Sequence, residues 1–284
     1  MVVNRVHHIG VVVRRLEEAC AFFRDTLGLA LLKEDRMEDQ GVRGALLDVG
    51  NSFLELLEPI VPDTGIARFL ERRGEGLHHV CLEVDDIEAT LADLKAKGVP
   101  LVDETPREGM VGTIAFVHPS ALQGVLAELV HAASAFAHDG PTGLSRVRRL
   151  DHLVFAVTDA APPIDAWRQL FGLRAEPSVR PEGTHMELTF LPVGDPDGDH
   201  MFLELVRPTT DDHRVARHIA EWGEGMFSLA FEVDDLDAAV RELRAKGGTI
   251  GDSEVGVLPK SRIARIPRDS AHGVAVQLIE RERS

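Results

Sequence analysis

The sequence predicts an α+β protein built from four βαβββ units that are arranged as two pairs. The first supporting observation is an internal repeat: "GEGLHHVCLEVDD" at 74–86 returns as "GEGMFSLAFEVDD" at 223–235. The second is that, inside each repeat, β-branched runs alternate with short segments of helical periodicity. A chain of 284 residues is long enough for two domains with their own cores.

The repeat extends well beyond this segment. Further matched pairs are "VHHIGVVV" and "LDHLVFAV", "FLEL" and "FLEL", and "IARFLERRGEG" and "VARHIAEWGEG". We therefore expect one domain at residues 1–133 and a second domain at residues 148–284. The stretch at 134–147 between them is small and polar with Gly and Pro, as linkers often are.

The segment "DDIEATLADLKAKG" at 85–98 has the signals of a complete helix. Asp85 is the expected N-cap, with Glu88 three residues later as in a capping box. Gly98 supplies the expected stop at the C-terminal end. The apolar residues of this helix form one stripe at Ile87, Leu91 and Leu94.

Alternation along two strands places histidines where they can line a cleft. In "HHVCLEV", the face with His79 and Cys81 is polar, whereas His78 falls with the apolar residues and is interpreted as structural. In the first strand, His8 and His7 are expected on opposite faces, because neighbouring residues of a strand alternate.

Two other strands of the first half each carry one glutamate on an otherwise apolar face, Glu55 and Glu128. Burying an unpaired carboxylate is costly, so each needs a cation or strong donors. Together with His8 and His79, these residues suit one divalent metal ion such as Co, Ni, Mn, Zn or Fe. The alternative is four separately satisfied polar residues, because the four lie far apart in sequence.

Several segments of the first half resemble methylmalonyl-CoA epimerase, a family of the vicinal oxygen chelate (glyoxalase/bleomycin resistance/dioxygenase) superfamily. These segments are "HHIGVVV", "FLELLEP", "IARFLERRGEGLHHVCLEVDD", "GTIAFVHP" and "GVLAEL". The resemblance implies paired βαβββ units that close into a cleft. It also implies a metal in the N-terminal half, held by His8, Glu55, His79 and Glu128.

The activity implied by this resemblance is removal of the α-proton of a methylmalonyl-CoA-like acyl thioester through an enolate, which is racemase/epimerase chemistry. Glu128 is expected to be the catalytic base. No second acid/base is assigned, because the matching region reads Val42-Arg43-Gly44-Ala45. The expected partner is a small-molecule substrate, an acyl-CoA. Cations that could contact its phosphates are Lys33, Arg43 and Arg107, each of which is also a common kind of surface charge.

The second half resembles the superfamily more loosely, as expected for a tandem fusion with a degenerate copy. The positions that match the four ligands are His152, Glu204, Ser228 and Gln277. Ser and neutral Gln are weak ligands for a transition metal, so we expect no catalytic metal there. The second half is interpreted as a built-in partner, which makes the chain a pseudo-dimer. Ligand binding in a metal-free cleft, covering of the first site, and a true homodimer remain open.

Composition excludes several function classes. The formal net charge of −16 opposes binding to nucleic acid or anionic membranes. The N-terminus lacks a signal-peptide layout, and no apolar run reaches the roughly 20 residues that span a bilayer. Two cysteines, Cys20 and Cys81, give no disulfide framework, which fits a reducing environment. A cytoplasmic location is therefore expected.

Four other functions are alternatives to the epimerase. An extradiol dioxygenase would keep its ligands in the second half and rely on tyrosine, and this chain has no tyrosine. A glyoxalase-like lyase shares the His/Glu/His/Glu ligands. Another enolisation enzyme, acting on a different acyl thioester or keto acid, uses the same chemistry. A non-enzymatic small-molecule-binding protein of this fold would usually lack the metal ligands.

Overall fold

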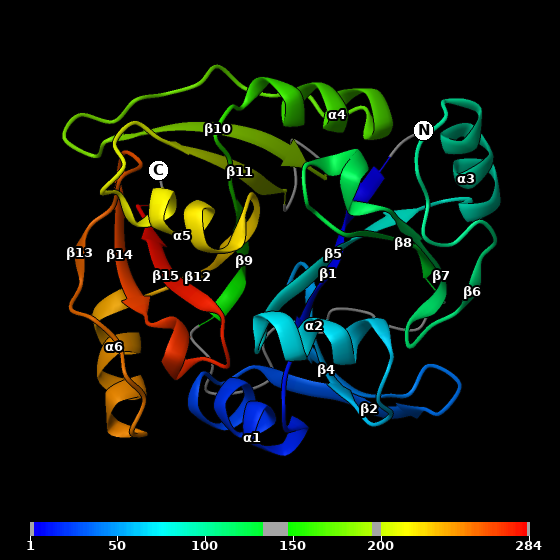
Figure 1. The fold of residues 1–284 in the computed structure, drawn as a ribbon. Coiled ribbons are helices and arrows are strands. Elements are labelled where there is room, and N and C mark those ends of the chain that lie inside the picture. The colour runs from blue at the N-terminus through cyan, green and yellow to red at the C-terminus, as the bar shows by residue number, and fades with distance from the viewer. Residues whose placement is uncertain (1–2, 133–146, 195–199, 283–284) are drawn as a thin grey trace. The chain divides into compact units, whose positions relative to one another are not determined.

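The structure is a computed structural model, and it describes residues 3–132, 147–194 and 200–282. Strands and helices alternate along both halves in an α+β arrangement (Figure 1). The predicted linker at 134–147 lies outside the described residues except for Val147. The two domain boundaries therefore stay predictions.

The first half forms two units of the predicted βαβββ type. The first unit consists of β1 (Val3–Val12), α1 (Leu16–Cys20) with its π-helical continuation η1 (Ala21–Thr26), β2 (Ala30–Met37), β3 (Val42–Asp48) and β4 (Phe53–Pro59). The helix α2 (Gly65–Arg73) connects it to the second unit. That unit consists of β5 (Gly76–Val84), α3 (Ile87–Ala96), β6 (Arg107–Glu108), β7 (Gly112–Val117), the 3-10 turn η2 (Pro119–Leu122) and β8 (Ala127–Ala132).

The second half repeats this order of elements. The third unit consists of β9 (Val147–Ala156), α4 (Ala161–Phe171), β10 (Met186–Val193) and β11 (Met201–Pro208), and α5 (Arg214–Trp222) follows. The fourth unit consists of β12 (Gly225–Val233), α6 (Leu236–Ala245), β13 (Glu254–Val255), β14 (Ser261–Ile266), the 3-10 turn η3 (Arg268–Ser270) and β15 (Ala275–Arg281).

The third unit differs from the prediction, because its described part has two strands after the helix instead of three. A single bridge between Val179 and Leu188 stands where the missing strand is expected. Pro177 and Pro181 flank Val179, and proline cannot donate to a strand ladder. The prolines thus explain why pairing does not extend beyond one bridge.

The strands form two mixed sheets with the same connectivity. The order is β2-β3-β4-β1-β5-β8-β7-β6 in one sheet and β10-β11-β9-β12-β15-β14-β13 in the other. The positions of the four predicted ligands fall on four consecutive strands, β4, β1, β5 and β8. Their counterparts fall on β11, β9, β12 and β15 in the same order. Neighbouring strands lie about 4.8 Å apart, so side chains on one face can converge.

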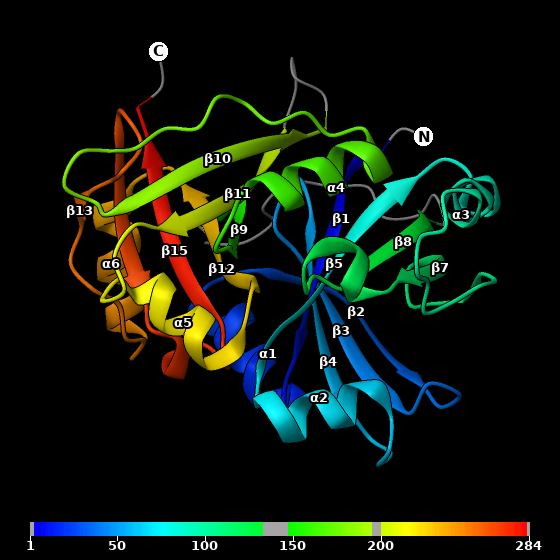
Figure 2. The same ribbon diagram turned by 45° about the horizontal axis from the view of Figure 1, so that its top comes forward.

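The helices pack on the sheets through the apolar stripes that the sequence predicted. In Figures 1 and 2, α3 lies against β7 and β8, and α6 lies against β14 and β15. The stripe residues Ile87, Leu91 and Leu94 of α3 are all buried. The corresponding residues of α6, Leu236, Val240 and Leu243, are buried as well.

The N-cap of α3 differs from the prediction by one residue. Asp86, not Asp85, accepts a hydrogen bond from the backbone N–H of Ala89, at 2.9 Å. Asp85 instead accepts a hydrogen bond from the side chain of Asn4, at 2.8 Å. In the second half, Asp235 caps α6 in the same way.

Backbone contacts divide the chain into two compact units, and each combines segments of both halves. One unit contains residues 1–8, 79–137 and 153–227; the other contains 9–78, 138–152 and 228–284. In the second of these, the Asn51 side chain exchanges two hydrogen bonds with the Leu150 backbone, at 3.0 and 2.9 Å. Segments 99 residues apart are thus held together within one unit.

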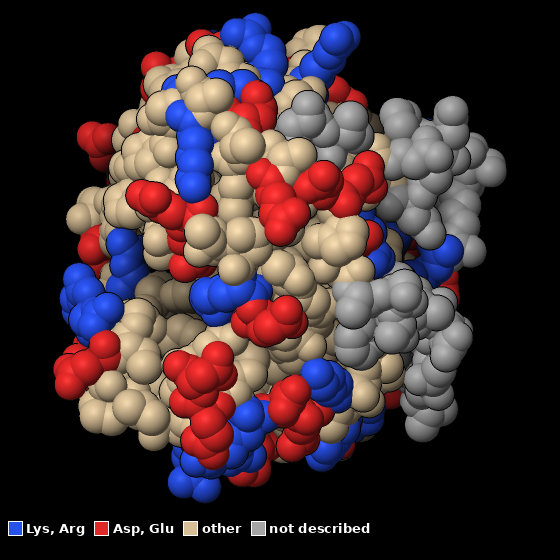
Figure 3. All heavy atoms as spheres, turned by 90° about the vertical axis from the view of Figure 1, so that its right-hand side faces the viewer, with Lys and Arg blue, Asp and Glu red and all other residues tan. Residues whose placement is uncertain are grey.

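Among the residues that the structure describes, no helix has the length and apolar character needed to cross a membrane. Figure 3 shows one face of the molecule, on which acidic and basic side chains are interspersed. The net negative charge is therefore not gathered into a single patch on this face.

Candidate metal centre

Three of the predicted ligands come together in one buried cluster. His8 on β1, His79 on β5 and Glu128 on β8 have exposed fractions of 0%, 1% and 4%. The Nε2 atoms of His8 and His79 are 3.0 Å apart. Oε2 of Glu128 lies 3.4 Å from Nε2 of His79, and Oε1 of Glu128 lies 3.7 Å from Nε2 of His8.

These separations fit atoms that share one metal ion. A metal bound at about 2.1 Å to two atoms holds them about 3.0 Å apart at a right angle and about 3.4 Å apart at the tetrahedral angle. Two imidazoles with a carboxylate are donors that Zn, Fe, Co, Ni and Mn accept. The donor set therefore fits a divalent metal, and the identity of that metal is open.

The fourth predicted ligand, Glu55, is buried on β4 with an exposed fraction of 5%. Glu55 falls in a different contact unit from His8, His79 and Glu128, so it is not counted with that cluster. The assignment of the four residues as ligands of one metal ion therefore stays a prediction.

Burial sets the protonation state of the histidine on β1. It lowers the pKa of His8 to about 3, so the ring is neutral near neutral pH. A neutral imidazole is the form that binds a metal. Burial lowers the pKa of His78 as well, to about 4, and its ring packs edge-on against Phe69 with centroids 4.9 Å apart, which agrees with a structural role.

Two further residues lie in the cluster: Cys81, which the sequence places on the same strand face as His79, and His7, which the sequence places on the opposite face from His8. Nδ1 of His7 lies 2.9 Å from Nδ1 of His8, although strand alternation predicts opposite faces for the two rings. The Cys81 thiol donates to Oε1 of Glu128 at 3.5 Å. The sequence held one signal for His7: the matching position in the second half is Asp151, also beside a histidine.

In the second half, the matching positions carry different chemistry. His152 is buried on β9, and its Nδ1 lies 2.6 Å from Oδ2 of Asp151. Ser228 is buried on β12 where the first half has His79. Gln277 on β15 pairs across the sheet with Ala230 and Arg265, as Glu128 pairs with Cys81 and Phe116. Both metal-ligand groups found among the described residues lie in the first half.

An ion pair between Arg281 and the buried Asp151 stabilises the contact of Asp151 with His152. Arg281 donates from Nε and Nη2 to the two carboxylate oxygens of Asp151, both at 2.7 Å. Burial alone raises the pKa of Asp151, but the hydrogen bonds from Arg281 and His152 outweigh it and hold the pKa below its usual range. The pair thus keeps a fully buried carboxylate ionised.

Removing the arginine is expected to destabilise the fold. Arg281→Met leaves the Asp151 carboxylate without its main partner and should cost about 2–3 kcal/mol, less than for a fully buried pair because Arg281 is partly exposed. Urea unfolding at pH 7 measures the loss. Arg281→Lys, which keeps the charge without the two-pronged contact, should fall between the variant and the wild type.

The same change should alter the response to acid. Because the folded-state pKa of Asp151 is below its unfolded value, this contribution is present above about pH 4 and is lost as pH falls toward the folded-state pKa. The stability difference between Arg281→Met and the wild type should therefore shrink below about pH 4. Equal stability at pH 7 would contradict the argument.

The cations considered for phosphate contacts are occupied by neighbouring acids. Arg43 pairs with Glu17 at 2.8 Å, and Lys33 pairs with Asp35 at 2.9 Å. Arg107 lies 3.5 Å from Asp103 and stacks over the Phe116 ring at 5.5 Å. Phe116 in turn meets the His79 ring edge-on at 5.4 Å. Of these three cations, Arg107 is thus the one that the Phe116 ring connects to the cluster.

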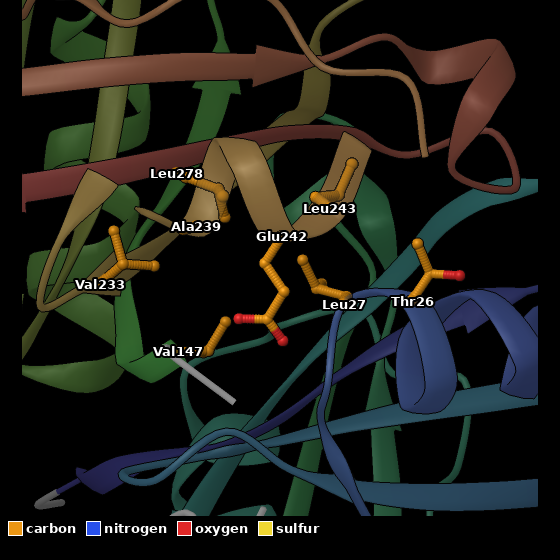
Figure 4. A pocket seen from close by; sticks show the side chains of 8 residues that line it. All are labelled: Thr26, Leu27, Val147, Val233, Ala239, Glu242, Leu243 and Leu278. Atoms are coloured by element: carbon orange, nitrogen blue, oxygen red, sulfur yellow. The ribbon is translucent and has the colours of Figure 1, made fainter. Parts of the chain in front are cut away.

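A small cavity lies apart from these residues. It has a volume of about 20 Å³ and contains none of the predicted ligands (Figure 4). Its lining is mostly apolar and consists of Thr26, Leu27, Val147, Val233, Ala239, Glu242, Leu243 and Leu278. This is room for about one water molecule, so the cavity is not a substrate site.

Comparison with known proteins agrees with the repeat. Residues 7–116 and 151–262 each match the family described as Glyoxalase/Bleomycin resistance protein/Dioxygenase superfamily. The mitochondrial methylmalonyl-CoA epimerase of Bos taurus is 38% identical over 131 residues, covering 45% of this chain and 75% of that protein. The ethylmalonyl-CoA/methylmalonyl-CoA epimerase of Cereibacter sphaeroides is 35% identical over 130 residues, covering 45% and 97%.

A solved structure extends the likeness to the whole chain. A mutant 4-hydroxymandelate synthase from Streptomyces coelicolor has a TM-score of 0.74 and covers 100% of this chain and 94% of its own. At 19% identity this likeness concerns the fold alone. The predicted architecture of two paired modules is thus confirmed, whereas the epimerases account for less than half of the chain.

Proposed function

The chain belongs to the glyoxalase/bleomycin resistance protein/dioxygenase superfamily, and we propose that it is a metal-dependent epimerase of a methylmalonyl-CoA-like acyl thioester. The observation that carries this proposal is the buried convergence of His8, His79 and Glu128, with ligand-atom separations of 3.0 to 3.7 Å. Relatives named as methylmalonyl-CoA epimerases, 35–38% identical over 45% of the chain, support the substrate class.

The proposed centre consists of His8, Glu55, His79 and Glu128 around one divalent ion. When bound, such an ion supplies Lewis-acid polarisation of a thioester carbonyl and so favours loss of the α-proton. The neutral His8 ring and the His79 ring offer their Nε2 atoms, and burial of all four residues keeps bulk water away from them. Exclusion of water strengthens every electrostatic interaction inside the site.

Glu128 is the proposed base. Its carboxylate lies within 3.7 Å of both imidazoles and accepts a hydrogen bond from the Cys81 thiol, so three neighbours fix its position. A carboxylate held in this way can take the α-proton of a bound thioester without a large rearrangement. The group that returns a proton to the opposite face has no assignment.

The second half is proposed to act as a built-in partner of the first. Each contact unit combines segments of both halves, as expected if the two halves associate like the subunits of a dimer. In one unit, Gly124 approaches the backbone carbonyl of Glu224 so closely that a Cβ would lie 2.7 Å from the oxygen. In the other unit, Gly273 meets the backbone of Glu75 in the equivalent way. These paired approaches support a pseudo-dimer within one chain.

The test is exchange of the α-proton in D₂O, followed by NMR with (2R)- or (2S)-methylmalonyl-CoA and the cobalt-loaded chain. We expect deuterium at the α-carbon with the wild type and loss of this exchange in His79→Ala. His152→Ala, which changes the matching position of the second half, should exchange like the wild type.

Three outcomes separate the parts of the proposal. Exchange that survives His79→Ala would remove the proposed centre. Loss of exchange in His152→Ala would show that the second half contributes chemistry. No exchange by a wild-type chain that binds one cobalt ion would reject this substrate and direct the search to other enolisable acids and to thiol adducts.

A further inference from the structure

The two ring nitrogens of His8 face two different neighbours. Nε2 lies 3.0 Å from Nε2 of His79, on the side of the proposed metal centre. Nδ1 lies 2.9 Å from Nδ1 of His7, and the two rings meet at 82°. His7 and His8 are both buried, with exposed fractions of 1% and 0%. One ring thus connects the centre to a residue that the sequence placed on the opposite face.

Metal binding fixes where the proton of His8 must be. If Nε2 of His8 binds a metal, the neutral ring carries its proton on Nδ1. At 2.9 Å, that N–H donates a hydrogen bond to Nδ1 of His7. His7 must then accept through Nδ1 and carry its own proton on Nε2. A buried Nδ1–H without an acceptor would be costly, so His7 favours the tautomer that binds metal.

The second half repeats this arrangement with another residue. Asp151 precedes His152 as His7 precedes His8, and its Oδ2 lies 2.6 Å from Nδ1 of His152. The hydrogen bond to Nδ1 is therefore present in both halves, although the accepting residue differs. Two unlike residues that make the same contact indicate that the contact itself, and not the packing of one ring, is the common feature.

We propose that His7 is a positioning residue that holds His8 in the Nδ1–H tautomer and so presents Nε2 to the metal. This inference rests on the metal centre of the proposed function, but it does not depend on the substrate. His7 takes no part in proton transfer to the thioester. Its effect is on metal affinity and on the geometry of the bound ion.

The cluster of His7, His8 and Cys81 allows a competing explanation. Their ligand atoms also lie within 4.8 Å of one another, so they have the composition of a second, softer metal site. The two explanations predict different stoichiometries. A positioning hydrogen bond gives one metal ion per chain, whereas a second site gives two, the second of which needs the Cys81 thiol.

The test compares cobalt affinities of full-length variants by competition with a chelator. His7→Phe removes the acceptor at similar size and should weaken binding about 10- to 100-fold and change the visible cobalt spectrum. His7→Asn keeps a neutral acceptor and should stay within about threefold of the wild type. Asn is preferred to Asp because Ala132 stands where the second half has Arg281, so a carboxylate would be unbalanced. The exposed His131→Phe is the matched control.

A second measurement is independent of any variant. In the zinc-loaded wild type, a long-range ¹H–¹⁵N spectrum should show His8 protonated at Nδ1. Three results would each overturn the role of His7. They are equal cobalt affinities of His7→Phe and the wild type, equal weakening of cobalt binding in His7→Asn and His7→Phe, and a second cobalt ion that is lost in Cys81→Ala. No metal binding by the wild type would overturn the centre as well, whereas absence of epimerase activity would leave this test intact.

Discussion

Glu128→Gln is expected to lower the rate of α-proton exchange of methylmalonyl-CoA about 10³-fold at saturating cobalt. The substitution keeps the size of the side chain and an oxygen that can still contact the metal, but it removes the carboxylate proposed to take the proton. The Cys81 thiol and both imidazoles keep their neighbour, so the surrounding structure should not change. The rate is measured by NMR in D₂O, with cobalt raised until it no longer increases.

Glu55→Gln is the matched comparison, because it removes the other carboxylate of the proposed centre. It should weaken cobalt binding, yet at saturating cobalt its exchange rate should stay within about tenfold of the wild type. The difference between the two variants isolates the proton-transfer role from the ligand role. Equal losses in both variants would mean that Glu128 acts only as a ligand and that the base lies elsewhere.

The faces of individual strands could be predicted from sequence, whereas their order in the sheet could not. Alternation along each strand identified the face that carries His79 and the face that carries Glu128. It does not say that β5 and β8 are neighbours, or that β1 and β4 flank them. The likeness to a known family implied the set of ligands but no strand order, and only the order in the structure makes a cluster out of separate residues.

His7 shows the limit of alternation at close range. The period of two assigns His7 and His8 to opposite sides, yet their Nδ1 atoms are 2.9 Å apart. An imidazole is long enough for its nitrogen to reach past the backbone when both rings are buried. The pattern describes where a side chain starts, and the hydrogen-bonding nitrogen lies at its far end.

Local signals also failed where a distant residue competes. Two consecutive aspartates precede α3, and the capping-box spacing to Glu88 predicts the first of them, Asp85, as the cap. Asn4, 81 residues away, binds Asp85 and leaves Asp86 to cap the helix. In the second half, Arg148 takes the place of Asn4 and pairs with Asp234 at 3.3 Å, so Asp235 becomes the cap. In both helices, a tertiary contact to the first aspartate thus leaves the second aspartate as the N-cap.

Removal of the metal is expected to lower the melting temperature of the chain by roughly 10 °C. An ion that binds only the folded state stabilises it by about 4 kcal/mol when its concentration is 1,000 times its dissociation constant. For a chain of this size, each kcal/mol corresponds to about 2–4 °C. Without an ion, the buried Glu128 carboxylate lies beside two imidazoles that are 3.0 Å apart, with no divalent charge to balance it.

The experiment is thermal unfolding with cobalt or zinc, with a chelator, and after the metal is restored. In His79→Ala, the chelator should have little effect, because the cluster has lost one of its imidazoles. His152→Ala should respond to the chelator like the wild type, since its position matches His8 but its neighbours Ser228 and Gln277 are poor ligands. A melting temperature that does not depend on metal would mean that the chain has no such metal centre. A metal effect that persists in His79→Ala and disappears in His152→Ala would place the centre in the second half. Because the assay needs no substrate, its result separates the metal centre from the identity of the thioester.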